Sequence, residues 1–181
     1  MTLETTVKNR LKVGQIVTLE TLSKMQLESE KNEALDKALT HISATRKTEK
    51  QMRNFLRGKG YLPDVIDYVL EKMREYDFIN DGEYAEAYVD FAGAKKGGRL
   101  IKMELKSKGI AQEQIDAALD GLSEEKQTEA AVAILQKYLR NKEITREALQ
   151  KAFRYLLSKG FDYEVAKSAL TAFGECENEE E

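Results

Sequence analysis

Cysteine, proline and histidine are nearly absent from this chain, and the shortage excludes several classes of protein. Among 181 residues there is one of each. A single cysteine can form neither a disulfide framework nor a thiolate metal cluster, so we expect a reducing, cytoplasmic location. Cys176 lies in an acidic tail and is interpreted as an inert thiol. His41 has no cysteine or second histidine nearby in the sequence, so we predict no metal site.

Long apolar runs are missing as well. No stretch approaches the roughly 18 consecutive apolar residues of a membrane helix, and the N-terminus lacks the apolar core of a signal peptide. We therefore expect no membrane partner. The sequence is nevertheless 41% hydrophobic, which is enough for a core, and with one proline and eleven glycines it favours helix almost throughout.

A segment of the form Leu-x-x-Lys-Gly-apolar occurs three times. Its copies contain Gly60, Gly109 and Gly160, which are 49 and 51 positions apart. Glycine can adopt the left-handed conformation that closes a helix, so we expect each one just past a helix end. Leucines four residues before and ten residues after each glycine are predicted to be buried at equivalent places: Leu56, Leu105, Leu156, Leu70, Leu119 and Leu170. A repeat of this length is typical of tandem helical units, which usually form extended binding surfaces.

The repeats predict an all-α fold of three tandem three-helix units in an extended, curved array. A lead-in segment precedes them and an acidic tail, too charged to pack, follows. The expected boundaries are residues 1–28 for the lead-in, 29–79, 80–122 and 123–174 for repeats 1, 2 and 3, and 175–181 for the disordered tail.

Capping residues mark several helix starts. Thr48 and Asp81 are suitable N-caps, and a further helix is expected after Thr145. Pro63 suits the first turn of a helix. In the lead-in, the sequence from Thr18 is compatible with a short capped helix.

Basic residues occupy the same four positions in the middle helices of repeats 1 and 2. Counted backwards from the glycine, these positions are −14, −10, −7 and −3. The spacing of four, three and four places them on one helical face. The eight residues, called here the two basic stripes, are Arg46, Lys50, Arg53 and Arg57 in repeat 1 and Lys95, Arg99, Lys102 and Lys106 in repeat 2.

The local charge indicates a binding role for these stripes. Residues 46–60 and 95–109 each carry a net charge of +5, although the whole chain has −3. Like charges at this spacing repel one another, and a merely solvated face would usually mix signs. A phosphate backbone or an acidic protein groove would compensate them. We expect the eight side chains to be exposed, without internal carboxylate partners, and to form one continuous surface. A purely solvated face remains the alternative.

Repeat 3 lacks the stripe, and other candidate sites are weak. Its equivalent positions hold Arg146, Gln150, Phe153 and Leu157. The glycine-rich segment 93–100 nearly matches a phosphate-binding loop but lacks the motif's Lys-Ser/Thr pair and preceding strand, so a helix break is expected there. Since no nucleophile, positioned base or pocket signature occurs, we predict no catalytic residue, no enzyme activity and no cofactor.

Four segments resemble the RecX family of recombinase regulators. They are residues 38–50, 56–61, 78–85 and 105–110, within a resemblance that covers about residues 30–174. The resemblance implies a cytoplasmic protein of three three-helix repeats that binds the RecA–DNA filament and modulates, usually inhibits, strand exchange and ATP hydrolysis. The implied partners are the RecA recombinase filament and single-stranded DNA, and the expected state is a monomer. Longer members begin with an additional N-terminal segment, so a short member or a trimmed chain is expected.

Two other functions remain open at this point. A free-standing DNA-binding protein with helix-turn-helix-like units would read bases with Asn, Gln or Arg on a groove-entering helix, whereas this chain offers a repetitive lysine and arginine stripe. Comparing its binding across DNA sequences distinguishes that function from filament binding. A hydrolase or nuclease has only scattered carboxylates to support it.

Overall fold

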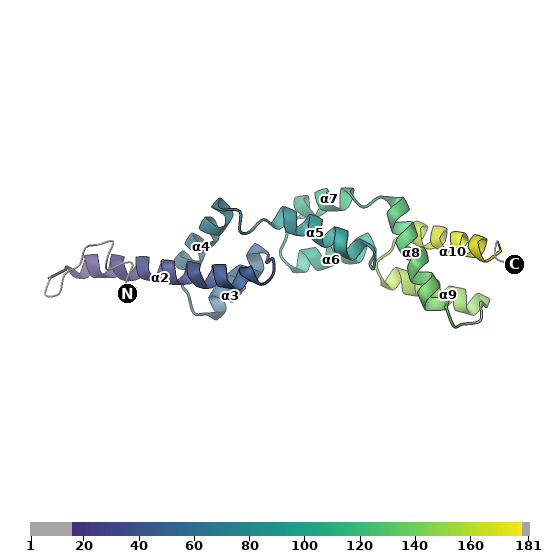
Figure 1. The fold of residues 1–181 in the computed structure, drawn as a ribbon, viewed down its shortest axis with the longest axis horizontal. Coiled ribbons are helices and arrows are strands. Elements are labelled where there is room, and N and C mark those ends of the chain that lie inside the picture. The colour runs from purple at the N-terminus through teal and green to yellow at the C-terminus, as the bar shows by residue number, and fades with distance from the viewer. Residues whose placement is uncertain (1–15, 179–181) are drawn as a thin grey trace. The chain divides into compact units, whose positions relative to one another are not determined.

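The computed structural model describes residues 16–178, with side chains described as far as residue 174. Within these residues the chain forms nine α-helices and no strand (Figure 1). The predicted all-α repeat fold is therefore confirmed. The chain divides into two compact units, Met1–Asn80 and Asp81–Glu181, which are described separately.

The first unit contains α2 (Leu19–Ser43), α3 (Glu49–Gly58) and α4 (Pro63–Glu75). Thr18 caps α2, since its hydroxyl accepts a hydrogen bond from the Thr21 N–H at 3.2 Å. The helix then runs for 25 residues without a break. The short helix expected in the lead-in and the first helix of repeat 1 are thus one helix, and the expected boundary at residue 28 falls inside it.

Thr48 fixes the start of α3, as predicted. Its hydroxyl accepts from the Gln51 N–H at 3.3 Å, while the Gln51 side-chain oxygen accepts from the Thr48 N–H at 3.0 Å. This reciprocal capping box satisfies two donors that a helix start would otherwise leave unpaired. The core below it is made of residues from all three helices and the segment after α4: Ala34, Ala38, Met52, Leu56, Val65, Ile66, Val69, Leu70, Met73 and Ile79.

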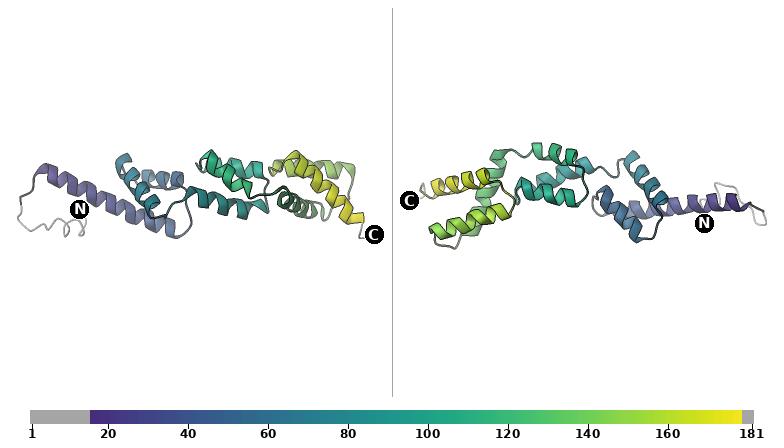
Figure 2. Two further views of the ribbon diagram at one scale, coloured as in Figure 1. Left: turned by 90° about the horizontal axis from the view of Figure 1, so that it is seen from above. Right: turned by 180° about the vertical axis from the view of Figure 1, so that it is seen from behind.

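The second unit contains the remaining six helices. Repeat 2 supplies α5 (Asp81–Gly93), α6 (Gly98–Ser107) and α7 (Gln112–Asp120), and repeat 3 supplies α8 (Glu124–Leu139), α9 (Arg146–Ser158) and α10 (Tyr163–Asn178). In both views of Figure 2 the last three helices lie together at the C-terminal end of the ribbon.

The end of α10 corrects the prediction for the tail. We expected disorder from residue 175, but α10 continues to Asn178. Helix propagation adds one hydrogen bond for each residue fixed, so an existing helix extends more easily into a charged segment than a new helix forms there. Residues 179–181 lie outside the described residues, as do residues 1–15 of the lead-in.

Each Leu-x-x-Lys-Gly-apolar segment closes a helix in the same way. Gly60, Gly109 and Gly160 have φ of +87°, +89° and +87° and lie two residues past α3, α6 and α9. In each copy the N–H of the apolar residue donates to the carbonyl of the leucine, at 3.3, 3.3 and 3.2 Å, and the glycine N–H donates to the next carbonyl at 3.0 Å. This is the Schellman closure, which requires glycine at the left-handed position.

The two trios of leucines are buried to different degrees. Leu56, Leu105 and Leu156 are fully buried, as predicted. In the second trio Leu70 is fully buried, but Leu119 and Leu170 are only half-buried. That part of the prediction is wrong, because these two leucines pack at the edge of their repeat's core rather than inside it.

Repeats 2 and 3 are joined by a main-chain contact that the sequence analysis did not predict. The Gly97 N–H donates to the Lys159 carbonyl at 3.0 Å, and the Arg99 N–H donates to the Gly160 carbonyl at 3.2 Å. A Cβ atom on Gly97 would lie 2.1 Å from the Phe161 nitrogen, and one on Gly160 would lie 2.4 Å from Leu100. Only glycine permits this approach, and it packs the start of α6 against the end of α9.

Candidate nucleic-acid interface

The structure places three members of the first stripe on α3 and one before it. Lys50, Arg53 and Arg57 lie within the helix, whereas Arg46 lies in the connection ahead of the Thr48 cap. Arg46, Lys50 and Arg57 are exposed and Arg53 is half-buried. The prediction of four residues on one helical face is therefore wrong at the −14 position, because the capping box starts the helix later.

Arg53 is held by two acidic residues. Its guanidinium lies 2.6 Å from Asp67 of α4 and 3.3 Å from Glu49 on its own helix. The hydrogen bond to Asp67 raises the pKa of Arg53 above its ordinary value, against the effect of partial burial. Glu49 also pairs with Arg74 at 3.0 Å, so four charged groups form one network. The expectation that the stripe lacks internal carboxylate partners is wrong for Arg53.

The second stripe lies on and before α6, and it too includes side chains that form internal ion pairs. Lys102 is half-buried and its ammonium lies 2.7 Å from Asp116 of α7, while the Arg99 guanidinium lies 3.8 Å from Asp162. The hydrogen bond from Lys102 lowers the pKa of Asp116. Lys95 precedes the helix, and its ammonium lies over the Phe91 ring, 4.6 Å from the centroid. The expected lack of carboxylate partners is thus also wrong for Lys102 and Arg99.

Position −7 forms the shortest of these ion pairs in both repeats. Arg53 and Lys102 each contact a carboxylate on the following helix, four residues beyond the helix start, at Asp67 and Asp116. The two repeats therefore share a tie between their second and third helices. Position −3 behaves differently. Arg57 and Lys106 are exposed, and within the described residues neither forms an ion pair.

The start of α6 lies beside the second stripe. At the start of α6 the backbone amides are already used, because the Gly98 N–H donates to the Gln127 side chain at 2.9 Å and Arg99 to Gly160. The segment 93–100 is therefore a helix break with occupied amides, as expected, rather than a phosphate cradle. Gln127 was missed by the sequence analysis, and a glycine at 97, where the other repeats have Thr48 and Thr145, is the signal that could have found this contact.

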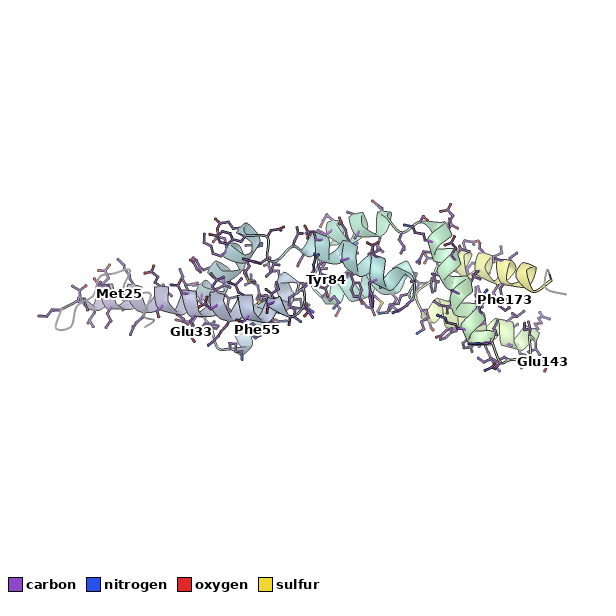
Figure 3. The ribbon with its side chains drawn as sticks, in the orientation of Figure 1. Met25, Glu33, Phe55, Tyr84, Glu143 and Phe173 are labelled. Carbon is purple, nitrogen blue, oxygen red and sulfur yellow. The ribbon has the colours of Figure 1, made fainter. Side chains whose placement is uncertain are left out.

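Phe55, Tyr84 and Tyr88, which lie near the stripes, pack against their own repeats. The rings of His41 and Phe55 are parallel with centroids 3.8 Å apart, and the Lys59 ammonium lies 5.6 Å from the Phe55 centroid (Phe55 is labelled in Figure 3). Tyr84 and Tyr88 stack at 6.2 Å and are half-buried against the core of repeat 2. The tyrosine pair therefore serves packing.

Other kinds of site find little support in the described residues. Within residues 16–174, whose side chains are described, no group of three or more His, Cys, Asp and Glu side chains is placed to hold a metal ion. No helix among the described residues is long and apolar enough to span a membrane. The exposed lysines and arginines of the two stripes are suited to binding a polyanion.

Three family models match the chain in succession. The first, second and third three-helix domains of RecX match residues 34–73, 80–119 and 124–170. The chain belongs to the RecX family. The resemblance stated from the sequence segments is thereby confirmed.

Curated RecX relatives and solved RecX structures agree with this assignment. Regulatory protein RecX of Clostridium perfringens (strain 13 / Type A) is 32% identical over 167 residues, covering 90% of this chain and 79% of that protein. The protein of the same name from Clostridium beijerinckii is 34% identical, covering 92% and 80%. A crystal structure of regulatory protein RecX has a TM-score of 0.80 at 25% identity, covering 92% and 84%. RecX from Lactobacillus salivarius has a TM-score of 0.75 at 27% identity, covering 81% and 98%. The relatives' names support a regulatory role for this RecX chain.

Proposed function

We propose that this protein binds the RecA–DNA filament and inhibits the strand exchange and ATP hydrolysis of RecA, acting as a cytoplasmic monomer through its two basic stripes. The observation that carries the proposal is the pair of exposed cations at position −3, Arg57 and Lys106, repeated in two units of a RecX chain. Both side chains are available to phosphate oxygens, whereas Arg53 and Lys102 already hold helices together.

The mechanism is differential binding. A chain that contacts one conformation of a filament more tightly than another shifts the filament toward that conformation, by as much as the two affinities differ. Exposed lysines and arginines supply the sequence-independent part of such binding, because each phosphate contact releases counterions. Regulation then requires neither a catalytic residue nor a cofactor in this chain.

Co-sedimentation with preassembled RecA filaments tests the proposal. We expect the protein to pellet with RecA filaments on single-stranded DNA more efficiently than with the same DNA alone, and to lower the rate of ATP hydrolysis in the same samples. Equal recovery with naked DNA and an unchanged hydrolysis rate would instead favour the alternative of a free-standing DNA-binding protein.

A further inference from the structure

The third repeat has a groove that is not part of the two basic stripes. The groove lies on α9 and α10, is open to solvent and has a volume of about 400 Å³. Its lining combines arginine, aromatic and amide side chains over an aliphatic floor: Arg146, Gln150, Phe153, Arg154, Tyr163 and Leu170.

Two aromatic rings form one wall of the groove. Phe153 and Tyr163 meet edge to face, with centroids 5.3 Å apart and an interplanar angle of 83°. Phe153 is half-buried and so fixes the pair to α9, while 59% of the Tyr163 surface is exposed. A large aromatic side chain left this open beside a hollow is accessible to a flat ligand.

The same two positions hold different residues in the other repeats. Position −7 is basic in repeats 1 and 2, as Arg53 and Lys102, and becomes Phe153 in repeat 3. Three residues after the glycine stand Pro63, Gln112 and then Tyr163. Repeat 3 therefore replaces the basic residue that ties two helices together with an aromatic pair at the same place.

Two arginines flank the aromatic wall along α9. Arg146 and Arg154 are exposed, and within the described residues neither guanidinium forms an ion pair. They are eight residues apart, which corresponds to about 12 Å along the helix axis. A guanidinium binds phosphate oxygens through two parallel hydrogen bonds, so the pair offers two anchoring points for one anionic chain.

We propose that this groove binds single-stranded DNA by stacking a base on Tyr163, with Arg146 and Arg154 holding the neighbouring phosphates. Charge complementarity favours this ligand over an apolar peptide, because such a peptide would leave both arginines uncompensated. Exposed aromatic rings beside a cationic track are the general means by which proteins bind single strands without reading their sequence. The inference rests on the proposed function, because the DNA that the groove would bind is the DNA of the filament. It assigns to repeat 3 a DNA contact that is separate from the two basic stripes.

Binding to labelled oligonucleotides tests the stack directly. The probes are a single-stranded thymidine oligonucleotide and an abasic oligonucleotide of the same length, which keeps the phosphates and lacks the bases. For Tyr163→Ala we expect affinity for the thymidine probe to fall about tenfold, the effect of one lost base–aromatic stack, while Tyr163→Phe binds like the wild type. On the abasic probe the wild type and Tyr163→Ala should bind equally.

Two controls distinguish binding in the groove from a loss of folding and from binding by the stripes. Tyr76 of repeat 1 is 62% exposed, close to the value of Tyr163, so Tyr76→Ala is a matched variant expected to bind like the wild type. A thymidine probe carrying 5-iodouracil should, on irradiation, cross-link to Tyr163 in the unsubstituted protein. This readout does not depend on the folding of any variant.

Several results would overturn the inference. They are no measurable binding of the thymidine probe by the wild type, equal affinity for it in wild type and Tyr163→Ala, or cross-links confined to other residues. Loss of filament binding by Tyr163→Ala with unchanged oligonucleotide affinity would mean that the groove holds a protein side chain. The proposed function survives all of these results if the stripes are still needed on filaments, so the two failures are distinguishable.

Discussion

At the scale of the residue, the repeated hexapeptide acquires a physical explanation. The glycine supplies a φ near +87°, the leucine carbonyl accepts the closing hydrogen bond, and the final apolar residue packs beside that leucine. The lysine before the glycine lies over an aromatic ring of its own repeat, as Lys59 over Phe55 and Lys159 over Tyr155. A cation at this end of a helix also interacts favourably with the helix dipole.

His41 provides a test of the packing at the end of α2. Partial burial and the charges of Lys47 and Lys59 lower the pKa of His41 below the ordinary histidine value. Since the folded pKa is lowered, the unfolded chain takes up a proton first as the pH falls, and stability decreases from the ordinary histidine range down to the folded pKa. The chain has one histidine, so its NMR titration needs no assignment. A midpoint at or above that of a histidine in a short peptide would contradict the partial burial of His41 near Lys47 and Lys59.

Asp116 offers a gain-of-binding variant. Asp116→Asn removes the carboxylate that holds Lys102 and so makes the net charge near the second stripe one unit more positive. We expect tighter binding to filaments by a few-fold, since an exposed ion pair is worth on the order of 0.5–1 kcal/mol. Glu129→Gln on α8 makes the same change of net charge elsewhere and should have a smaller effect. Equal effects of the two variants in a binding titration would mean that only overall charge matters.

At the scale of the element, the close approach of two glycines determines how repeats 2 and 3 pack. The N-cap of α3 is Thr48 and that of α9 is Thr145, and both use a hydroxyl to cap their helix. The N-cap of α6 is Gly97, which has no side chain, and the missing acceptors come from Gln127 and Gly160 of repeat 3. Because the start of α6 is capped by groups from repeat 3 rather than by its own side chain, repeats 2 and 3 are coupled.

Matched glycine substitutions measure this coupling. Gly60 and Gly160 share a φ of +87°, but a Cβ on Gly60 meets nothing within 4 Å, whereas one on Gly160 meets Leu100 at 2.4 Å. Gly60→Ala should lower the free energy of unfolding by about 1 kcal/mol, the cost of the backbone alone. Gly160→Ala adds a steric clash and should cost roughly 2–4 kcal/mol. Urea denaturation followed by circular dichroism gives both values. Equal losses would argue against the close contact.

The sequence was sufficient to predict the helices but not the ion pairs between their side chains. Periodicity and glycine spacing located the helices and four buried leucines, because both signals are local to a repeat. Asp67 and Asp116, the partners of Arg53 and Lys102, lie on the following helices, each 14 residues further along the chain. Asp162, the partner of Arg99, lies 63 residues further along, in the connection before α10. A count of charges along one helix contains no information about partners elsewhere in the chain, so the prediction that the stripes lack internal carboxylate partners was wrong for Arg53, Lys102 and Arg99.

At the scale of the whole molecule, the candidate interface is distributed over both units. The first stripe belongs to the unit that ends at Asn80, and the second belongs to the unit that begins at Asp81. The continuity of the two stripes as one surface remains a prediction. The groove of repeat 3 adds a third candidate contact, so a filament would be engaged by all three repeats through two kinds of chemistry.

Charge reversal at exposed positions of the stripes is the most direct test of the central claim. Reversing Arg53 would place a new carboxylate beside Asp67 and Glu49 and so endanger the fold. The triple variant Lys50→Glu, Arg57→Glu and Lys106→Glu instead changes three exposed side chains of the stripes. Its matched control carries the same change of net charge on exposed lysines of repeat 3, as Lys126→Glu, Lys137→Glu and Lys167→Glu.

The measurement is co-sedimentation of both triple variants with preassembled RecA filaments, with circular dichroism to show that each is folded. The stripe variant should lose at least tenfold in affinity, or about 1.4 kcal/mol, because three phosphate contacts are converted to repulsion. The control should retain most of its binding. A folded stripe variant that pellets with filaments as well as the control does would show that the basic stripes are merely solvated faces.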